Sequence, residues 1–170
     1  MEATMKTRKW VSWMLVLGSF VMMGSNGVAE TPSSYGPKSK RFGVGLHLGE
    51  PTGFTVKGYL TRRLGLDGIA AWSFTEDAFT LIGDVTYKFL DIPVDSNTVT
   101  LPFYAGAGFK LGVDAGPGDD TIFAVRVPVG LAVQWVKHPI EIFFELAPGV
   151  AMAPDTDFDL TGGIGARFYF

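Results

Sequence analysis

The sequence closes with DFDLTGGIGARFYF, residues 157–170, in which apolar and polar residues alternate. The apolar or small set is Phe158, Leu160, Gly162, Ile164, Ala166, Phe168 and Phe170. The other set is Asp157, Asp159, Thr161, Gly163, Gly165, Arg167 and Tyr169. Because successive side chains of a β-strand point to opposite faces, this stretch predicts a strand with one apolar and one polar face.

The same alternation recurs along the chain, separated by short connections rich in turn residues. The predicted strands are 42–49, 53–60, 64–74, 78–90, 101–113, 122–136, 140–153 and 157–170. No helical periodicity interrupts them, so the sequence predicts an all-β, eight-stranded, antiparallel up-and-down barrel. An even strand number places both ends of the chain on the same side. Pro128 and Pro148 fall inside predicted strands, and since proline has no N–H, we expect a bulge or local irregularity at each.

The first 29 residues read as a targeting segment rather than as part of the fold. Basic residues at 6, 8 and 9 precede an apolar stretch at 10–23, and Gly27-Val28-Ala29 supplies small residues for cleavage. We expect a cleavable signal peptide at 1–29, then a flexible periplasmic lead-in at 30–41 and a barrel at 42–170. Met5 begins a more typical signal peptide than Met1, so either is a candidate start.

Composition excludes several functional classes. The chain has no Cys, which excludes disulfides, thiolate metal sites and a Cys nucleophile. Residues 1–29 hold three of the 14 bases and one of the 17 acids, so the remainder carries a net charge of −5. A general nucleic-acid binder would need a basic surface, so we expect no nucleic-acid partner.

The polar face is the one expected inside. It is rich in Gly and Ala, which a narrow lumen requires, and eight strands leave room for little more than side chains. The expected lumen charges are Lys57, Asp67, Asp84, Lys88, Lys110, Arg126, Glu141, Glu145, Asp159 and Arg167, with His47, Tyr59, Tyr104 and Gln134 as polar partners. Equal numbers of acids and bases predict a self-neutralising network in which Arg126 pairs with Glu141 or Glu145. This network either plugs the barrel or lines a gated ion path or small polar site.

The apolar face then points outward, which favours a membrane barrel over a soluble one. Its aromatic residues fall into two bands, as in outer-membrane barrels. The expected outer band is Phe54, Trp72, Phe74, Phe79, Phe123 and Phe158, and the inner band is Phe42, Tyr87, Phe89, Phe103, Trp135, Phe168 and Phe170.

With its signal peptide, eight alternating segments and final ARFYF, the chain resembles small outer-membrane proteins of the OmpA-transmembrane-domain and OmpX type over residues 42–170. It is also similar to uncharacterised envelope barrels that open with a glycine-rich hairpin, here residues 43–60. The resemblance implies an integral outer-membrane location with lipid and lipopolysaccharide as surroundings. The sequence leaves the oligomeric state open, and we expect a monomer. The resemblance further implies that Phe168, Tyr169 and Phe170 are the signal read by the barrel-assembly machinery. The presumed outer connections are shorter than in adhesins of this class.

Chemistry at a defined site finds little support. Ser73 and His47 are both expected inside near the same rim, but no motif surrounds them, so we expect no catalytic residues and no enzyme activity. The outer connections hold acids and no Lys or Arg, which suggests either solvated turns or divalent-cation bridging to lipopolysaccharide. No EF-hand spacing occurs, and we expect no metal site and no cofactor. A structural or interaction barrel with a plugged lumen is the leading hypothesis, ahead of a narrow channel and a lipid-modifying enzyme.

Overall fold

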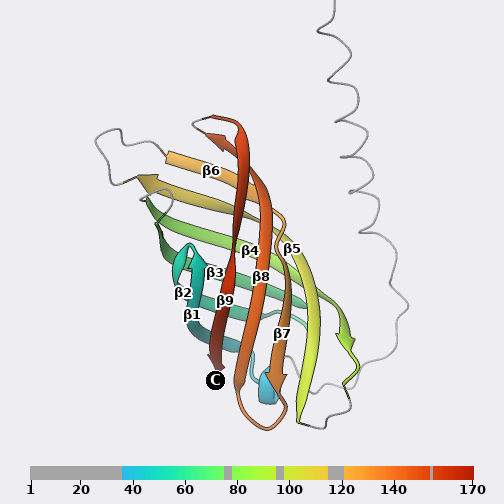
Figure 1. Ribbon diagram of the computed structural model, residues 1–170. Coiled ribbons are helices and arrows are strands. Elements are labelled where there is room, and N and C mark those ends of the chain that lie inside the picture. Colours follow the sequence, from blue (N-terminus) through green and yellow to red (C-terminus); the bar gives the residue numbers. More distant parts are fainter. Residues whose placement is uncertain (1–35, 75–77, 95–97, 115–120, 154) are drawn as a thin grey trace, which may run out of the picture. The chain divides into compact units, whose positions relative to one another are not determined.

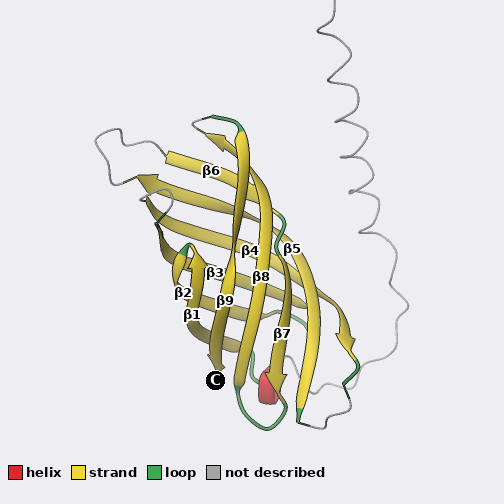
Figure 2. Cartoon of the chain, in the orientation of Figure 1, coloured by secondary structure: helices red, strands yellow, loops and turns green. Residues whose placement is uncertain are grey.

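The computed structural model describes residues 36–74, 78–94, 98–114, 121–153 and 155–170. The predicted signal peptide and residues 30–35 of the predicted lead-in lie outside these ranges. Within them the fold is all-β, and a single short 3₁₀ turn accompanies the strands (Figure 2). No helix among the described residues is long and apolar enough to cross a membrane.

The strands follow the alternating segments closely. Their bounds are β1 Phe42–Glu50, β2 Thr52–Tyr59, β3 Leu64–Ser73, β4 Ala78–Ile92, β5 Val99–Asp114, β6 Thr121–Arg126, β7 Val129–Trp135, β8 Ile140–Ala153 and β9 Asp157–Tyr169. Every pairing is antiparallel, and consecutive strands pair with each other except β6 and β7, which both lie between β5 and β8. β9 then pairs with β1, so the sheet closes into a ring that is roughly barrel-like (Figure 1).

The structure has nine strands where the alternation predicts eight, and the difference arises at Pro128. The predicted strand 122–136 is divided into β6 and β7 at residues 127 and 128, although the Pro128 carbonyl still accepts a hydrogen bond from the N–H of Gly106 at 2.8 Å. Both pieces pair with β5 on one side and β8 on the other, and their register is unchanged across the gap. The missing proline N–H therefore interrupts the ladder without turning the strand over.

A bulge at Pro148 is not observed. Pro148 pairs in register with Leu160 inside β8, and its carbonyl accepts a hydrogen bond from the N–H of Val127 at 2.9 Å. The register shifts instead fall between Lys88 and Leu90, and between Phe123 and Ala124. A proline tolerates a sheet position where no partner needs its N–H, so it does not itself require an extra residue.

The segment before β1 packs onto the ring, in contrast to the flexible lead-in predicted for residues 30–41. Pro37–Ser39 form the 3₁₀ turn η2, Pro37 is buried, and η2 contacts β7. The carbonyl of Arg41 accepts a hydrogen bond from the N–H of Tyr59 at 2.9 Å. Residues 36–41 therefore cover the end of the ring where both β1 begins and β9 finishes, called the terminal end below.

The two faces of the sheet differ in polarity in the sense opposite to that of a water-soluble barrel. Charged side chains such as Arg126 and Glu141 are buried inside, at 3% and 1% exposure. Large apolar side chains lie on the outer face, among them Leu48 at 59%, Phe54 at 71% and Ile164 at 52% exposure. Successive side chains of a strand point to opposite faces, and this alternation places the charged residues inside and the large apolar residues outside.

Candidate functional site

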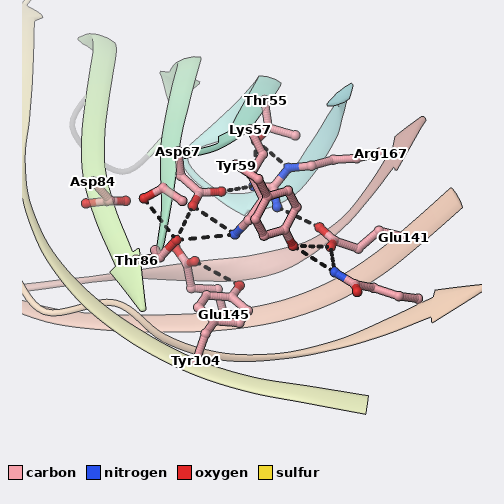
Figure 3. Close-up of polar contacts among 12 residues, drawn as sticks. Thr55, Lys57, Tyr59, Asp67, Asp84, Thr86, Tyr104, Glu141, Glu145 and Arg167 are labelled. Atoms are coloured by element: carbon pink, nitrogen blue, oxygen red, sulfur yellow. Dashed lines mark hydrogen bonds and ion pairs between the residues drawn. The ribbon is translucent and has the colours of Figure 1, made fainter. Parts of the chain in front are cut away.

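The interior of the ring is a connected set of buried charged and hydroxyl side chains (Figure 3). They come from β2, β3 and β4 on one wall and from β5, β6, β8 and β9 on the other, as the side chain alternation requires. The contacts of the charged side chains fall into four groups.

Arg167 holds the first group together. Its Nη1 lies 2.9 Å from Oε1 of Glu141 on the neighbouring strand, and its Nη2 lies 3.0 Å from Oδ1 of Asp67 across the ring. The guanidinium also donates to Oγ1 of Thr55 through Nε at 3.1 Å and Nη2 at 2.8 Å. One side chain thereby links β2, β3, β8 and β9.

The second oxygen of Glu141 binds neutral side chains. The Gln134 amide donates to Oε2 of Glu141 at 2.6 Å and to the hydroxyl of Tyr59 at 2.8 Å. The Tyr59 hydroxyl donates to the same carboxylate oxygen at 3.4 Å. Glu141 therefore connects Arg167 to the neutral side chains of Gln134 and Tyr59.

Lys57 and Asp67 form the second group. Nζ of Lys57 lies 2.9 Å from Oδ2 of Asp67, and both side chains are almost fully buried. Thr86 donates its hydroxyl to the same Oδ2 at 2.7 Å. Nζ also lies 4.7 Å from the centre of the Tyr104 ring, close enough for a cation–π contact.

Arg126 forms the third group. Its Nη2 lies 2.6 Å from Oε1 of Glu145, its Nε lies 3.3 Å from Oδ1 of Asp84, and its Nη1 donates to Thr161 at 3.0 Å. Tyr104 donates its hydroxyl to Oε2 of Glu145 at 3.0 Å. Of the two partners that the sequence allows for Arg126, the structure pairs it with Glu145, while Glu141 binds Arg167.

Lys110 and Asp159 form the fourth group, an ion pair whose side chains are 3% and 8% exposed. Lys88 lies apart from all four groups. Its side chain is partly exposed at the terminal end and pairs with Asp91 at 3.1 Å. The buried network among the described residues therefore has four bases and five acids.

His47 and Ser73 bind different partners. Nδ1 of His47 donates to the carbonyl of Pro51 at 2.8 Å, and the imidazole stacks on the Phe143 ring at 5.9 Å between centres. Ser73 donates its hydroxyl to the Glu50 carboxylate. These contacts are not those of a nucleophile and its base.

Three buried aromatic residues pack in the lumen in a way that the sequence analysis did not predict: Tyr104, Phe143 and Tyr169. Tyr104, counted there only as a polar partner, packs with Ala132 and Phe143 in one buried cluster. Phe143 lies between Glu141 and Glu145 on the inward face of β8, and Cζ of Arg167 lies 3.8 Å from the centre of its ring. Tyr169, expected as part of an assembly signal, is buried at 1% exposure. Strict alternation applied to Phe143 and Tyr169 would have placed both inside.

These rings lie over glycines on the opposite strand. A Cβ added to Gly165 would come within 2.3 Å of Cζ of Phe143, and one added to Gly130 within 2.3 Å of the Tyr104 ring. The two glycines are the direct partners of those aromatics in the sheet register. Each glycine therefore provides the space that its partner ring occupies.

Two cavities lie at the two ends of the described ring. A cavity of about 260 Å³ lies at the terminal end, against η2, Gln134 and Trp135. One of about 180 Å³ lies at the opposite, distal end, where β1 meets β2 and β8 meets β9. A pocket of about 10 Å³, near the minimum for one water molecule, lies beside Tyr104 and Glu141 and also reaches Lys88 at the terminal rim.

The predicted aromatic bands lie on the outer face. Exposed members are Phe42, Phe54, Trp72, Phe74, Phe79, Phe89, Phe158, Phe168 and Phe170, and half-buried ones are Tyr87, Phe103, Phe123 and Trp135. Phe42 and Phe170 pack edge to face at 5.3 Å between ring centres, where β1 and β9 meet.

No group of three or more His, Asp or Glu among the described residues could hold a metal ion. Comparisons with protein-family models, curated proteins and solved structures found no match to this chain.

Proposed function

We propose that this protein is a small integral outer-membrane β-barrel whose polar lumen is plugged by its own side chains, with a structural or interaction role in the cell envelope. The observation that carries the proposal is the polarity of the ring, with ion pairs buried inside and large apolar side chains exposed outside. An exposed apolar face of this extent is unfavourable in water and favourable in a lipid bilayer. A closed ring also leaves no strand edge to meet hydrocarbon along most of its wall.

The N-terminal sequence pattern supports export, and the aromatic residues near both rims fit the two interfaces of a membrane. The plugged lumen is supported by the buried ion pairs of the interior and by the Tyr104 and Phe143 rings that pack among them. A plug of this kind restricts the protein to roles at its rims and outer face.

Fractionation and electrophoresis test the proposal. Protein expressed with its leader should appear in the outer membrane with a new N-terminus at Glu30. Folded protein extracted without heating should migrate differently from heated protein, because a closed barrel resists detergent denaturation. Recovery in the cytoplasm, or retention of residues 1–29 in the mature protein, would contradict the proposal.

A further inference from the structure

The distal cavity lies at a step in the wall of the ring. The ladder between β1 and β9 ends at Glu50 and Gly162, whereas β9 continues back to Asp157 alongside β8. In Figure 1 the tip of the β1–β2 hairpin accordingly stops short of the ends of β8 and β9. Residues 157–161 of β9 thus have β8 on one side, while β1 has already ended on the other.

The backbone N–H and C=O of Leu160 point toward the side of β9 where β1 has ended. The N–H of Phe170 donates to Phe42 on β1, and the N–H of Tyr169 donates to Pro139 next to β8. Backbone direction alternates along a regular strand, and β9 has no register shift against β8, so Leu160 faces the same way as Phe170. The side chains of Phe158 and Leu160, exposed on the outer face, border the same cavity.

Two residues that line this cavity each carry a buried oxygen atom with no hydrogen-bond partner among the described residues. The two atoms are Oδ2 of Asp159 and Oγ1 of Thr80, on residues that are 8% and 0% exposed. The other carboxylate oxygen of Asp159 binds Lys110. Buried polar atoms of folded proteins nearly always have a partner, so two free acceptors beside one cavity point to a ligand that donates hydrogen bonds.

The charge of this end favours a cation. The cavity is lined by Glu50 and Asp159 against one base, Lys110. Acids thus outnumber bases in the described lining, and a cleft lined mainly by acids raises the local concentration of cations. A metal ion is a poor fit, since the described residues here supply no group of three carboxylate or imidazole ligands.

We propose that the distal cavity binds a primary ammonium group, which enters through the step between β9 and the β1–β2 hairpin. An ammonium carries three N–H donors, and Asp159 Oδ2 and Thr80 Oγ1 can each accept one of them. Two sources share this chemistry: the amine-bearing headgroup of a lipid and a free small amine. The lipid source rests on the proposed membrane location, because its chain would lie along Phe158 and Leu160.

Titration of refolded full-length protein in a neutral sugar-headed detergent tests the inference. The probes are lysophosphatidylethanolamine, the matched lysophosphatidylcholine and free ethanolamine, with binding followed by calorimetry. Choline keeps the positive charge but has no N–H, so the ethanolamine lipid should bind at least about tenfold more tightly. Ethanolamine binding as tightly as the lipid identifies the free amine as the source. Equal affinity for the two lipids, or no binding of any probe, would overturn the ammonium site.

Two variants distinguish the site from the fold. Asp159→Asn should weaken ethanolamine-lipid binding by about tenfold or more, whereas Asp155→Asn, the same charge change on an exposed residue at this end, should not. Thr80→Val removes a hydroxyl that has no partner among the described residues, so the barrel should stay folded while binding weakens. Wild-type affinity in both Asp159→Asn and Thr80→Val would contradict the inference. Failure of the wild type to refold in detergent would contradict the proposed function instead.

Discussion

At the scale of single residues, each buried guanidinium serves two carboxylates. Arg167 binds Asp67 and Glu141, and Arg126 binds Asp84 and Glu145. Burying a charge without a partner costs several kcal/mol, so Asp84 and Glu145 depend on Arg126 and Glu141 depends on Arg167, whereas Asp67 also pairs with Lys57. A conservative exchange to Lys would supply a point charge without the planar fork that reaches both partners.

Reversal of one of these charges should cost far more stability than trimming the residue beside it. Arg126→Glu leaves Glu145 and Asp84 unpaired next to a third carboxylate, and should lower the free energy of unfolding by about 3–5 kcal/mol or more. Val127→Ala on the outer face, where Val127 is 50% exposed, should cost roughly 1 kcal/mol. Urea unfolding of both variants in lipid measures the difference. Equal losses would mean that Arg126 is hydrated and that the lumen is a pore.

A glycine beneath an aromatic ring should not tolerate a methyl group. Gly165→Ala would place Cβ about 2.3 Å from the Phe143 ring. The resulting overpacking should lower unfolding free energy by about 1–3 kcal/mol. Gly58→Ala is the control, because its nearest neighbouring atom would be 3.9 Å away, on Phe42. Thermal unfolding compares them, and Phe143→Leu should recover part of the loss in the Gly165→Ala background. Equal effects of the two alanine substitutions would refute this account.

At the scale of elements, β9 combines two roles on its two faces. Its inward residues Asp159, Thr161 and Arg167 contact charged or hydroxyl groups of the network. Its outward residues Phe158, Leu160, Ile164 and Phe168 are all more than half exposed, as is Phe170, which directly follows the strand. The strand also closes the ring against β1, so a defect in β9 affects lumen, wall and closure together.

Loss of the final aromatic should impair assembly more than stability. Phe170 is 58% exposed and packs on Phe42, so Phe170→Ala removes one outer contact and should cost about 1 kcal/mol in protein already folded. On the proposed function its side chain is part of the signal for insertion, so the amount of membrane-inserted protein should fall severalfold.

The matched control is Phe158→Ala, which removes the same side chain from the same strand at 68% exposure, near the distal end. Membrane levels are compared by quantitative immunoblotting, and stability by urea unfolding of refolded protein. Normal membrane levels of the Phe170→Ala variant would count against an assembly signal at residues 168–170.

At the scale of the whole described ring, packing in the middle separates the two end cavities. Tyr104 and Phe143 occupy that middle together with the surrounding ion pairs. Refolded wild-type protein should therefore show little stable conductance in a planar bilayer. The double variant Tyr104→Ala with Phe143→Ala should conduct more, because it removes two rings between the cavities.

Phe144→Ala is the control for that experiment, since Phe144 neighbours Phe143 but is 52% exposed on the outer face. Its conductance should match the wild type. Wild-type currents as large as those of the double variant would show that the lumen is already open and would favour the channel hypothesis.

The strand pattern and the division of residues between two faces could both be predicted from the amino-acid sequence. Alternation with a period of two is a local property, so it survives in any register, and the predicted segments match β1 to β9 to within about two residues at most ends. The split of the strand at Pro128 follows from the missing proline N–H. The unchanged register on both sides of the split could not be predicted from the proline. Sequence also indicated that ten charges share one face, of which nine are buried in the structure and Lys88 lies at the rim.

The pairing of the buried charges and the positions of the cavities could not be predicted from the sequence, because both depend on the folded chain. The partner of Arg126 depends on how neighbouring strands are staggered, and that stagger places Glu145 rather than Glu141 beside it. The same stagger ends β1 before β9 and so creates the distal step with its unpartnered Asp159 and Thr80 oxygens. The packing of the interior also depends on aromatic rings that lie over glycines of the paired strand, such as Phe143 over Gly165. Alternation specifies a face for each residue, whereas contacts across a closed sheet also depend on register and curvature, which no single segment encodes.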